Sequence, residues 1–135
     1  MKEYTHEIKR GNMQIILAVA LGGALGSVGR YMLTAATKEF TDLQGLGTLI
    51  VNTLGAFLLG MILGMTENRL ELSEPIKNGL TIGLLGGFTT FSTFMYDSIY
   101  HVEETNWLAA IILITATILL GLIVMISGLI IGRTV

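Results

Sequence analysis

Four long apolar stretches constrain the fold of this chain more than any other feature. They run at about 13–36, 46–65, 76–100 and 107–131. The length of each is close to that of a helix that crosses the hydrocarbon core of a bilayer, about 20 residues. The polar connections between them are too short to form a soluble domain. The sequence therefore predicts an all-α integral membrane protein, with residues 1–135 forming a single domain of four transmembrane helices.

The composition excludes several classes of function. The chain is 52% hydrophobic, carries a net charge of only -2 and has no cysteine. There is thus no disulfide, thiolate chemistry or cysteine metal site, and no basic patch that would neutralise nucleic-acid phosphates. An enzyme is disfavoured, because the two histidines lie at a helix end and in the N-terminal tail, without a nucleophile and base to complete a catalytic site. We predict neither catalysis nor nucleic-acid binding.

The third apolar stretch contains the most unusual segment of the chain. A glycine pair, Gly86-Gly87, is followed within it by phenylalanines and hydroxyl residues: Thr89, Thr90, Phe91, Ser92, Thr93 and Phe94. Irregular backbone is tolerated in hydrocarbon only where protein or an aqueous path covers it, and the glycine pair invites such a break. A helix that resumes after Thr90 would place the two later phenylalanines on one face and the residues between them on other faces.

Two interpretations of this segment remain open. Ring edges and hydroxyl donors placed close together can solvate a small anion that has lost its water. Alternatively, the glycines serve only the close packing of helices. Asp97, a few residues further on, marks either the approach to water or a pore mouth.

Single polar residues in the other apolar stretches are further candidates. Arg30 either snorkels to the membrane interface or attracts anions at a pore vestibule. Asn52 either ties two helices together or presents its amide hydrogens to a permeating anion. Thr117 is the candidate for a polar track in the last helix, although most such hydroxyls bond their own backbone four residues earlier. Gly22 and Gly26 form a GxxxG face on which another backbone can lie.

Three of these segments, in this order, resemble motifs of the CrcB/Fluc fluoride channel family. They are Gly-x-x-Gly-x-x-x-Arg with Gly23, Gly26 and Arg30, Gly-Thr-Leu-Ile-Val-Asn at 47–52, and Gly-Gly-Phe-Thr-Thr-Phe-Ser-Thr-Phe at 86–94. The resemblance covers the whole chain in length and in the number of apolar stretches. It implies a passive fluoride-selective channel in the cell membrane that exports fluoride from the cytoplasm. It also implies an antiparallel dimer with two pores and a broken third helix, surrounded by lipid.

The resemblance assigns roles to individual residues. Phe91 and Phe94 would line the pores with their ring edges, and Asn52 would donate to fluoride. Ser92 and Thr93 would belong to the hydroxyl-rich surroundings of the ion. The backbone carbonyls of Gly86 and Thr89, from both subunits, would bind a structural sodium ion at the dimer interface.

The distribution of positive charge bears on how such a dimer is made. One side of the membrane would carry six basic residues: Lys2, Lys9, Arg10, Arg69, Lys77 and Arg133. The other side would carry Arg30 and Lys38. The positive-inside rule then places both termini in the cytoplasm. Members of the family often insert in both orientations, which implies a smaller difference in basic residues between the two sides. The second subunit of the dimer is therefore either another copy of this chain or an oppositely oriented homologue that completes a heterodimer.

Two other functions fit four small membrane helices. A small proton-coupled multidrug exporter needs a carboxylate within the membrane to exchange protons for a cationic drug. The first apolar stretch here has only Arg30 as an ionisable residue. A non-conducting assembly subunit is the second alternative, because small-residue stripes pack helices without any transport.

Overall fold

The computed structural model describes residues 2–68 and 70–135, and these residues form helices and short connections without a strand. Arg69, counted above among the six basic residues, lies outside the described residues. The three long helices are α1 (Lys2–Phe40), α2 (Leu46–Asn68) and α6 (Trp107–Thr134). Between α2 and α6 the chain forms four short elements: α3 (Glu74–Asn78), the π-helix η1 (Gly79–Leu85), α4 (Gly86–Phe88) and α5 (Phe91–Glu103). The predicted all-helical class is confirmed.

Three helices are long and apolar enough to cross a membrane, by length and composition. They cover Gly11–Phe40, Leu46–Glu67 and Trp107–Thr134. These segments contain the predicted stretches 13–36, 46–65 and 107–131. The predicted stretch 76–100 is not one continuous helix, because α4 ends before α5 begins. That the series of elements from α3 to α5 also crosses the membrane remains a prediction.

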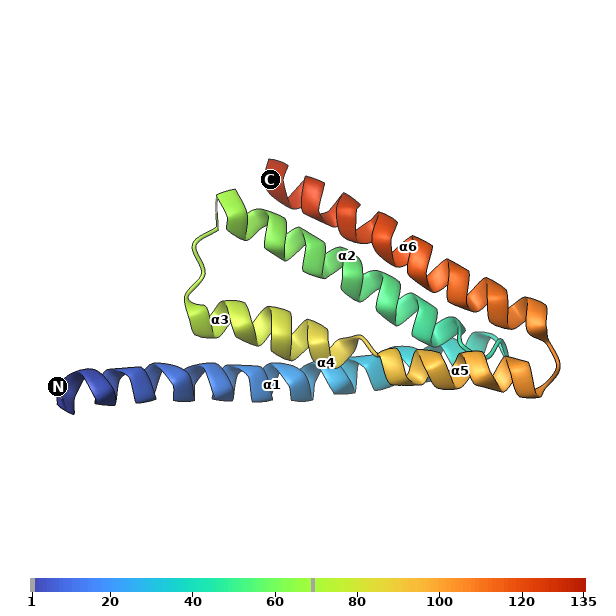
Figure 1. The fold of residues 1–135 in the computed structure, drawn as a ribbon, viewed down its shortest axis with the longest axis horizontal. Helices are drawn as coiled ribbons and strands as arrows, with labels where there is room; N and C mark the ends of the chain where they lie inside the picture. Colours follow the sequence, from blue (N-terminus) through green and yellow to red (C-terminus); the bar gives the residue numbers. More distant parts are fainter. Residues whose placement is uncertain (1, 69) are drawn as a thin grey trace.

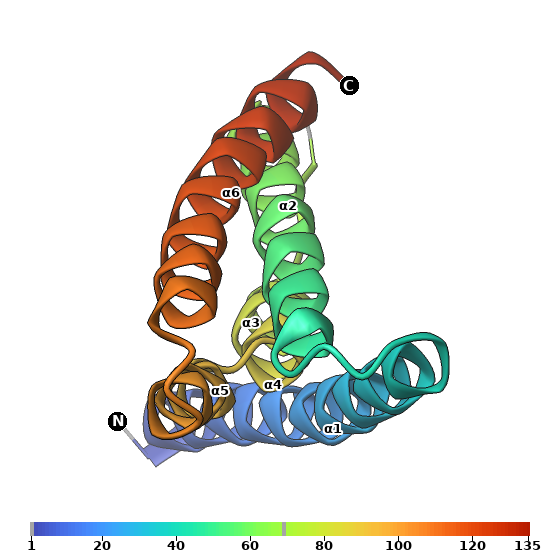
Figure 2. The same cartoon turned by 90° about the vertical axis from the view of Figure 1, so that its right-hand side faces the viewer.

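The helices run back and forth along the long axis of the molecule. In Figure 1, α2 packs alongside α6, and α3, η1 and α4 pack against α1, whereas α5 contacts α6 and α2. Figure 2 shows α1 beneath α3 and α4, with α2 and α6 rising above them. Both termini lie at the end that also holds the connection from α2 to α3, whereas the turns after α1 and after α5 lie at the opposite end.

The break in the series occurs at two threonines. Thr89 and Thr90 have extended backbones, with φ and ψ of -75° and 158° and of -151° and 126°. The prediction of a broken helix that resumes after Thr90 is thus confirmed, but the expectation that the helix ends at the glycine pair is wrong. Gly86, with φ of -65° and ψ of -35°, is helical, and the chain leaves the helix only after Phe88.

Close backbone packing explains the glycines of α1 and of the series. A Cβ atom at Gly22 or Gly26 would collide with backbone oxygens of η1, and one at Gly87 would lie 2.7 Å from the Gly23 carbonyl oxygen. The predicted GxxxG face is confirmed. Gly87 therefore brings α4 against α1, and the glycine pair does not terminate the helix.

Close backbone packing at glycines also joins α2 to α6. Added Cβ atoms at Gly60 and Gly64 would strike backbone oxygens of α6, and those at Gly128 and Gly132 would strike backbone oxygens of α2. Since backbone atoms cannot rotate away as side chains do, these four positions accept only glycine at the observed helix separation.

Candidate functional site

Asn52 on α2 clamps the break in the helical series. Its Nδ2 donates to the carbonyl oxygen of Thr90 at 2.9 Å, and its Oδ1 accepts from the Thr90 amide at 2.8 Å. Thr90 is 8% exposed, so its backbone groups need partners from within the protein. The structure thus confirms that Asn52 ties two elements together. An amide NH2 group has two hydrogens, and this bond uses one of them.

At the break, two backbone amides donate to side chains instead of to backbone carbonyls. In a continuous α-helix, the amide of Thr90 would bond the carbonyl of Gly86, and that of Thr93 would bond the carbonyl of Thr89. Here the first amide donates to Asn52, and the second donates to the Thr90 side chain at 3.3 Å, which caps α5. The break therefore presents two carbonyl oxygens that their usual helical donors do not occupy.

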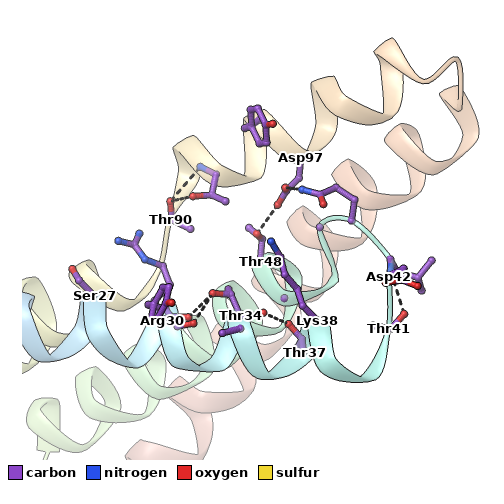
Figure 3. Close-up of a pocket in the computed structure, with 18 residues that line it drawn as sticks. Ser27, Arg30, Thr34, Thr37, Lys38, Thr41, Asp42, Thr48, Thr90 and Asp97 are labelled. Carbon is purple, nitrogen blue, oxygen red and sulfur yellow. Dashed lines mark hydrogen bonds between the residues drawn. The ribbon is translucent and has the colours of Figure 1, made fainter.

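Arg30 reaches one of these carbonyls from α1. Its Nη1 donates to the carbonyl oxygen of Thr89 over 3.4 Å. Figure 3 shows the Arg30 side chain extending from α1 toward the chain near Thr90. The guanidinium group therefore bonds a carbonyl at a helix end and also lines the polar cavity described next.

The polar cavity has a volume of about 750 Å³ and lies between α1, the turn after it, the start of α2 and α5. Its walls include hydroxyl groups from several threonines, among them Thr34, Thr48 and Thr93 (Figure 3). Its charged side chains are Arg30, Lys38, Asp42 and Asp97. A cavity of this kind can hold water and ions next to the break.

A second pocket, of about 540 Å³, lies on the other side of the break and is mostly apolar. The predicted residues that line it are Asn52, Gly86, Thr89, Phe91, Phe94 and Thr117. The rings of Phe91 and Phe94 meet edge to face, with centroids 5.9 Å apart and planes at 62°. Phe94 is 4% exposed, whereas Phe91 is 73% exposed. We name this site the phenylalanine pocket.

Thr117 supplies a hydroxyl to this pocket that is not used for packing. Its Oγ1 is buried and has no hydrogen-bond partner. By contrast, Ser127 on the same helix bonds the Ile123 carbonyl four residues earlier at 2.8 Å, as most such hydroxyls do. The Thr117 hydroxyl therefore has an unused donor beside this pocket.

Thr90 separates the two cavities and belongs to the walls of both. Its hydroxyl is 3.2 Å from that of Thr93, which faces the polar cavity, and 3.3 Å from that of Ser92, which lines neither cavity. The two phenylalanines lie on the opposite side, in the phenylalanine pocket. The prediction that these hydroxyls and rings occupy different faces of the resumed helix is confirmed.

Sequence reasoning missed Thr90 and Gln44 as site residues, and it left Asp97 undecided. Asp97 is 3% exposed and accepts hydrogen bonds from Gln44 and Thr48, so it does not reach bulk water. A threonine directly before a helical phenylalanine is a signal for a helix cap, and it could have identified Thr90. Gln44 has no such signal, because its role depends on a partner 53 residues away.

The fold and the site together define a class of protein. It is a small all-helical membrane protein in which a clamped break in one helical series separates a charged polar cavity from a phenylalanine pocket. The comparisons with known sequences agree with this class. The family described as "CrcB-like protein, Camphor Resistance (CrcB)" matches the chain over residues 17–129, and the chain belongs to this family.

Curated relatives cover nearly the whole chain. A protein of Chloroflexus aurantiacus named "Fluoride-specific ion channel FluC" is 44% identical over 122 residues, which are 90% of this chain and 97% of that protein. Proteins with the same name from Nitratidesulfovibrio vulgaris and Geobacter sulfurreducens are 41% and 38% identical, over 91% and 90% of this chain and 100% and 98% of their own lengths. The resemblance inferred from three motifs is thus confirmed over residues 17–129.

Proposed function

We propose that this chain is a fluoride-selective channel of the cell membrane, which exports fluoride passively from the cytoplasm and so lowers its toxicity. It is a transport protein and not an enzyme. The observation that carries the proposal is the phenylalanine pocket, where two ring edges, an amide and a free hydroxyl meet beside a helix break. Membership of the CrcB family and relatives that are named fluoride-specific channels support it.

The chemistry of the pocket suits a small anion that holds water tightly. A dry pore must replace the hydration shell of fluoride with many short donor contacts. The second amide hydrogen of Asn52, the Thr117 hydroxyl and the positive edges of the Phe91 and Phe94 rings are such contacts. Chloride is larger and gains less from the same narrow arrangement.

The polar cavity serves as the vestibule of this pore. Arg30 and Lys38 carry positive charge on its walls beside Asp42 and Asp97, and Arg30 extends to the break itself, where it bonds the Thr89 carbonyl. Thr93 and Thr90 continue the polar surface up to the break, with Ser92 adjoining them. Fluoride would thus pass from water, along Arg30, to the phenylalanine pocket.

The pore is completed by a second subunit. Phe91 is 73% exposed beside a pocket that it lines, so one chain does not enclose an ion there. The proposal therefore includes an antiparallel dimer with two pores, in which the series from α3 to α5 is the fourth membrane crossing of each subunit. Lipid would surround the remaining apolar faces of α1 and α6.

A structural sodium ion fits the break. Carbonyl oxygens at an interrupted membrane helix are suitable ligands for a hard cation, and the amides that would bond the Gly86 and Thr89 carbonyls in a continuous helix donate to side chains here. The Thr89 oxygen also accepts from Arg30, but a carbonyl has two lone pairs and can contact both. We propose that sodium bound there would hold two subunits together.

The charge bias favours both termini in the cytoplasm. The described basic residues Lys77 and Arg133 belong to α3 and to the last turn of α6, at the end of the molecule where both termini lie. Lys38 is in the last turn of α1, at the opposite end. A chain with one orientation needs an oppositely oriented homologue to build an antiparallel dimer. A heterodimeric fluoride channel is therefore the second candidate, whereas family membership gives no support to a multidrug exporter.

The decisive experiment uses the purified chain alone in liposomes loaded with fluoride or with chloride. Rapid loss of fluoride with chloride retained is the expected result for a self-sufficient channel. Phe91→Ala or Thr117→Val should slow that loss, whereas Ser127→Ala on the same helix should not, since its hydroxyl bonds its own backbone. If the chain alone is silent, addition of an oppositely biased homologue restores flux for a heterodimer, and continued silence refutes the proposal.

A further inference from the structure

Asp97 is a buried carboxylate in the wall of the polar cavity, and both of its oxygens have neutral partners. Oδ1 accepts from Gln44 Nε2 at 2.5 Å, and Oδ2 accepts from Thr48 Oγ1 at 2.6 Å. Figure 3 shows the carboxylate of Asp97 turned to these two donors, which come from the turn after α1 and from the start of α2. The negative charge is thus held by an amide and a hydroxyl.

The same cavity contains two cations, yet Asp97 does not pair with either. Arg30 and Lys38 line the cavity together with Asp97 and Asp42. Within the described part of the chain, the ion pair that the structure contains is Arg133 with Glu67, at the far ends of α2 and α6. The cavity cations therefore keep their charge available, although a buried carboxylate is part of the same wall.

Gln44 is held firmly in the position that this arrangement requires. Its backbone carbonyl accepts a hydrogen bond from His101 Nε2 at 2.9 Å. The next residue, Gly45, has a φ of 88°, in the left-handed region that favours glycine, and a Cβ there would lie 2.6 Å from Leu113 Cδ2. The His101 bond and the glycine turn hold the backbone at Gln44, and the side-chain amide points to Asp97.

We propose that Gln44 is a positioning residue for anion entry, which acts through Asp97. It keeps the carboxylate on neutral donors, and so leaves the guanidinium of Arg30 and the ammonium of Lys38 free to contact an entering anion directly. Without the Gln44 amide, Oδ1 loses a donor in a buried setting and turns to a cation of the same cavity, since a buried charge needs a partner. The inference rests on the proposed function, in which this cavity is the fluoride vestibule.

The test compares fluoride efflux at two ionic strengths. Gln44→Met keeps the length of the side chain and the backbone carbonyl that His101 binds, but it removes the amide donor. Charge attraction reaches about 30 Å at 0.01 M salt and about 8 Å at 0.15 M. We expect the wild-type protein to conduct faster at low salt. In the variant, the ratio of the low-salt rate to the high-salt rate should be roughly threefold to tenfold smaller, at the low end of electrostatic steering effects. The ratio of two rates from one preparation does not depend on how much protein has folded.

A second substitution separates positioning from a structural role. Asp97→Asn removes the charge that would otherwise neutralise the cations, so Gln44→Met combined with Asp97→Asn should restore the salt dependence to the wild-type level or above. Damage to the turn would leave the double variant as slow as Gln44→Met. Thr48→Val, which removes the other donor, should reproduce the effect of Gln44→Met.

The outcomes distinguish this inference from the function on which it rests. A wild-type protein that releases no fluoride, with or without a homologue, overturns the proposed function and the inference with it. A conducting wild-type protein whose Gln44→Met and Thr48→Val variants keep the wild-type salt dependence overturns only the inference. Failure of Asp97→Asn to rescue Gln44→Met overturns it as well.

Discussion

Replacement of Asn52 by alanine tests whether a single side chain holds the helix break in place. The substitution removes both hydrogen bonds between Asn52 and the backbone of Thr90. Each buried polar group left without a partner costs about 1–3 kcal/mol, so the two groups together cost about 2–6 kcal/mol. Thr90 lines the polar cavity, and water entering from there would move the loss toward the lower end of this range.

The measurement is the free energy of unfolding in mixed detergent micelles, with helix content as the signal. Thr53→Val is the matched control, because it alters the next residue of the same helix. The Thr53 Oγ1 is buried without a hydrogen-bond partner, so its removal breaks no bond and should leave stability unchanged or slightly higher. A variant Asn52→Ala that is as stable as the wild-type protein would refute the reasoning, since the clamp would then contribute nothing.

Asn52→Asp separates the structural role of this side chain from its proposed contact with fluoride. A carboxylate can still accept from the Thr90 amide, but it cannot donate to the Thr90 carbonyl and it adds a negative charge to the phenylalanine pocket. The carboxylate oxygen that replaces the amide nitrogen would face the Thr90 carbonyl oxygen, so we expect a loss of stability at least as large as for Asn52→Ala, together with a larger loss of fluoride efflux. Equal losses of efflux in the two variants would indicate that Asn52 acts only through the clamp.

Three further predictions follow from the same structure. Gly26→Ala should destabilise the protein, because its Cβ would collide with backbone, whereas Gly121→Ala, with nothing within 4 Å of the new Cβ, should be tolerated when the two are compared by thermal unfolding. Thr117→Val should slow fluoride efflux about tenfold without loss of stability, in line with the loss of one donor contact, and Thr117→Ser should restore the rate; an unchanged rate for valine would remove this hydroxyl from the ion path. Arg133→Gln should change stability little, because its ion pair with Glu67 is exposed, and raising the salt concentration should abolish any difference from the wild-type protein.

Much of the fold follows from patterns that are local in the sequence. Apolar stretches of about 20 residues specify membrane helices by length alone, and three of the four predicted stretches match helices of that kind. Glycines spaced four apart, such as Gly22 and Gly26, specify where two backbones approach. The motif at 86–94 identified the family because its residue types, order and spacing can be compared directly with those of relatives.

The site was only partly accessible to the same reasoning. Phe91 and Phe94 share a face because side chains three positions apart are neighbours on any helix, and this was predictable. Arg30 was a candidate from its charge within an apolar stretch, but its partner, the Thr89 carbonyl, lies 59 positions away. The free hydroxyl of Thr117 also needed the structure, because a sequence does not reveal whether a hydroxyl bonds its own helix.

The sequence alone thus determined that the chain is helical, belongs in a membrane and carries a fluoride-channel motif. The tertiary structure decided where the helix breaks and what the break exposes. A glycine pair permits many conformations, and the choice among them depends on which donors and acceptors come within reach. Asn52, 38 residues from Thr90, takes both backbone groups of that threonine, so the break falls beyond the glycines. The physical reason is that a buried amide or carbonyl must find a partner, and only the packing of distant segments determines which partner it finds.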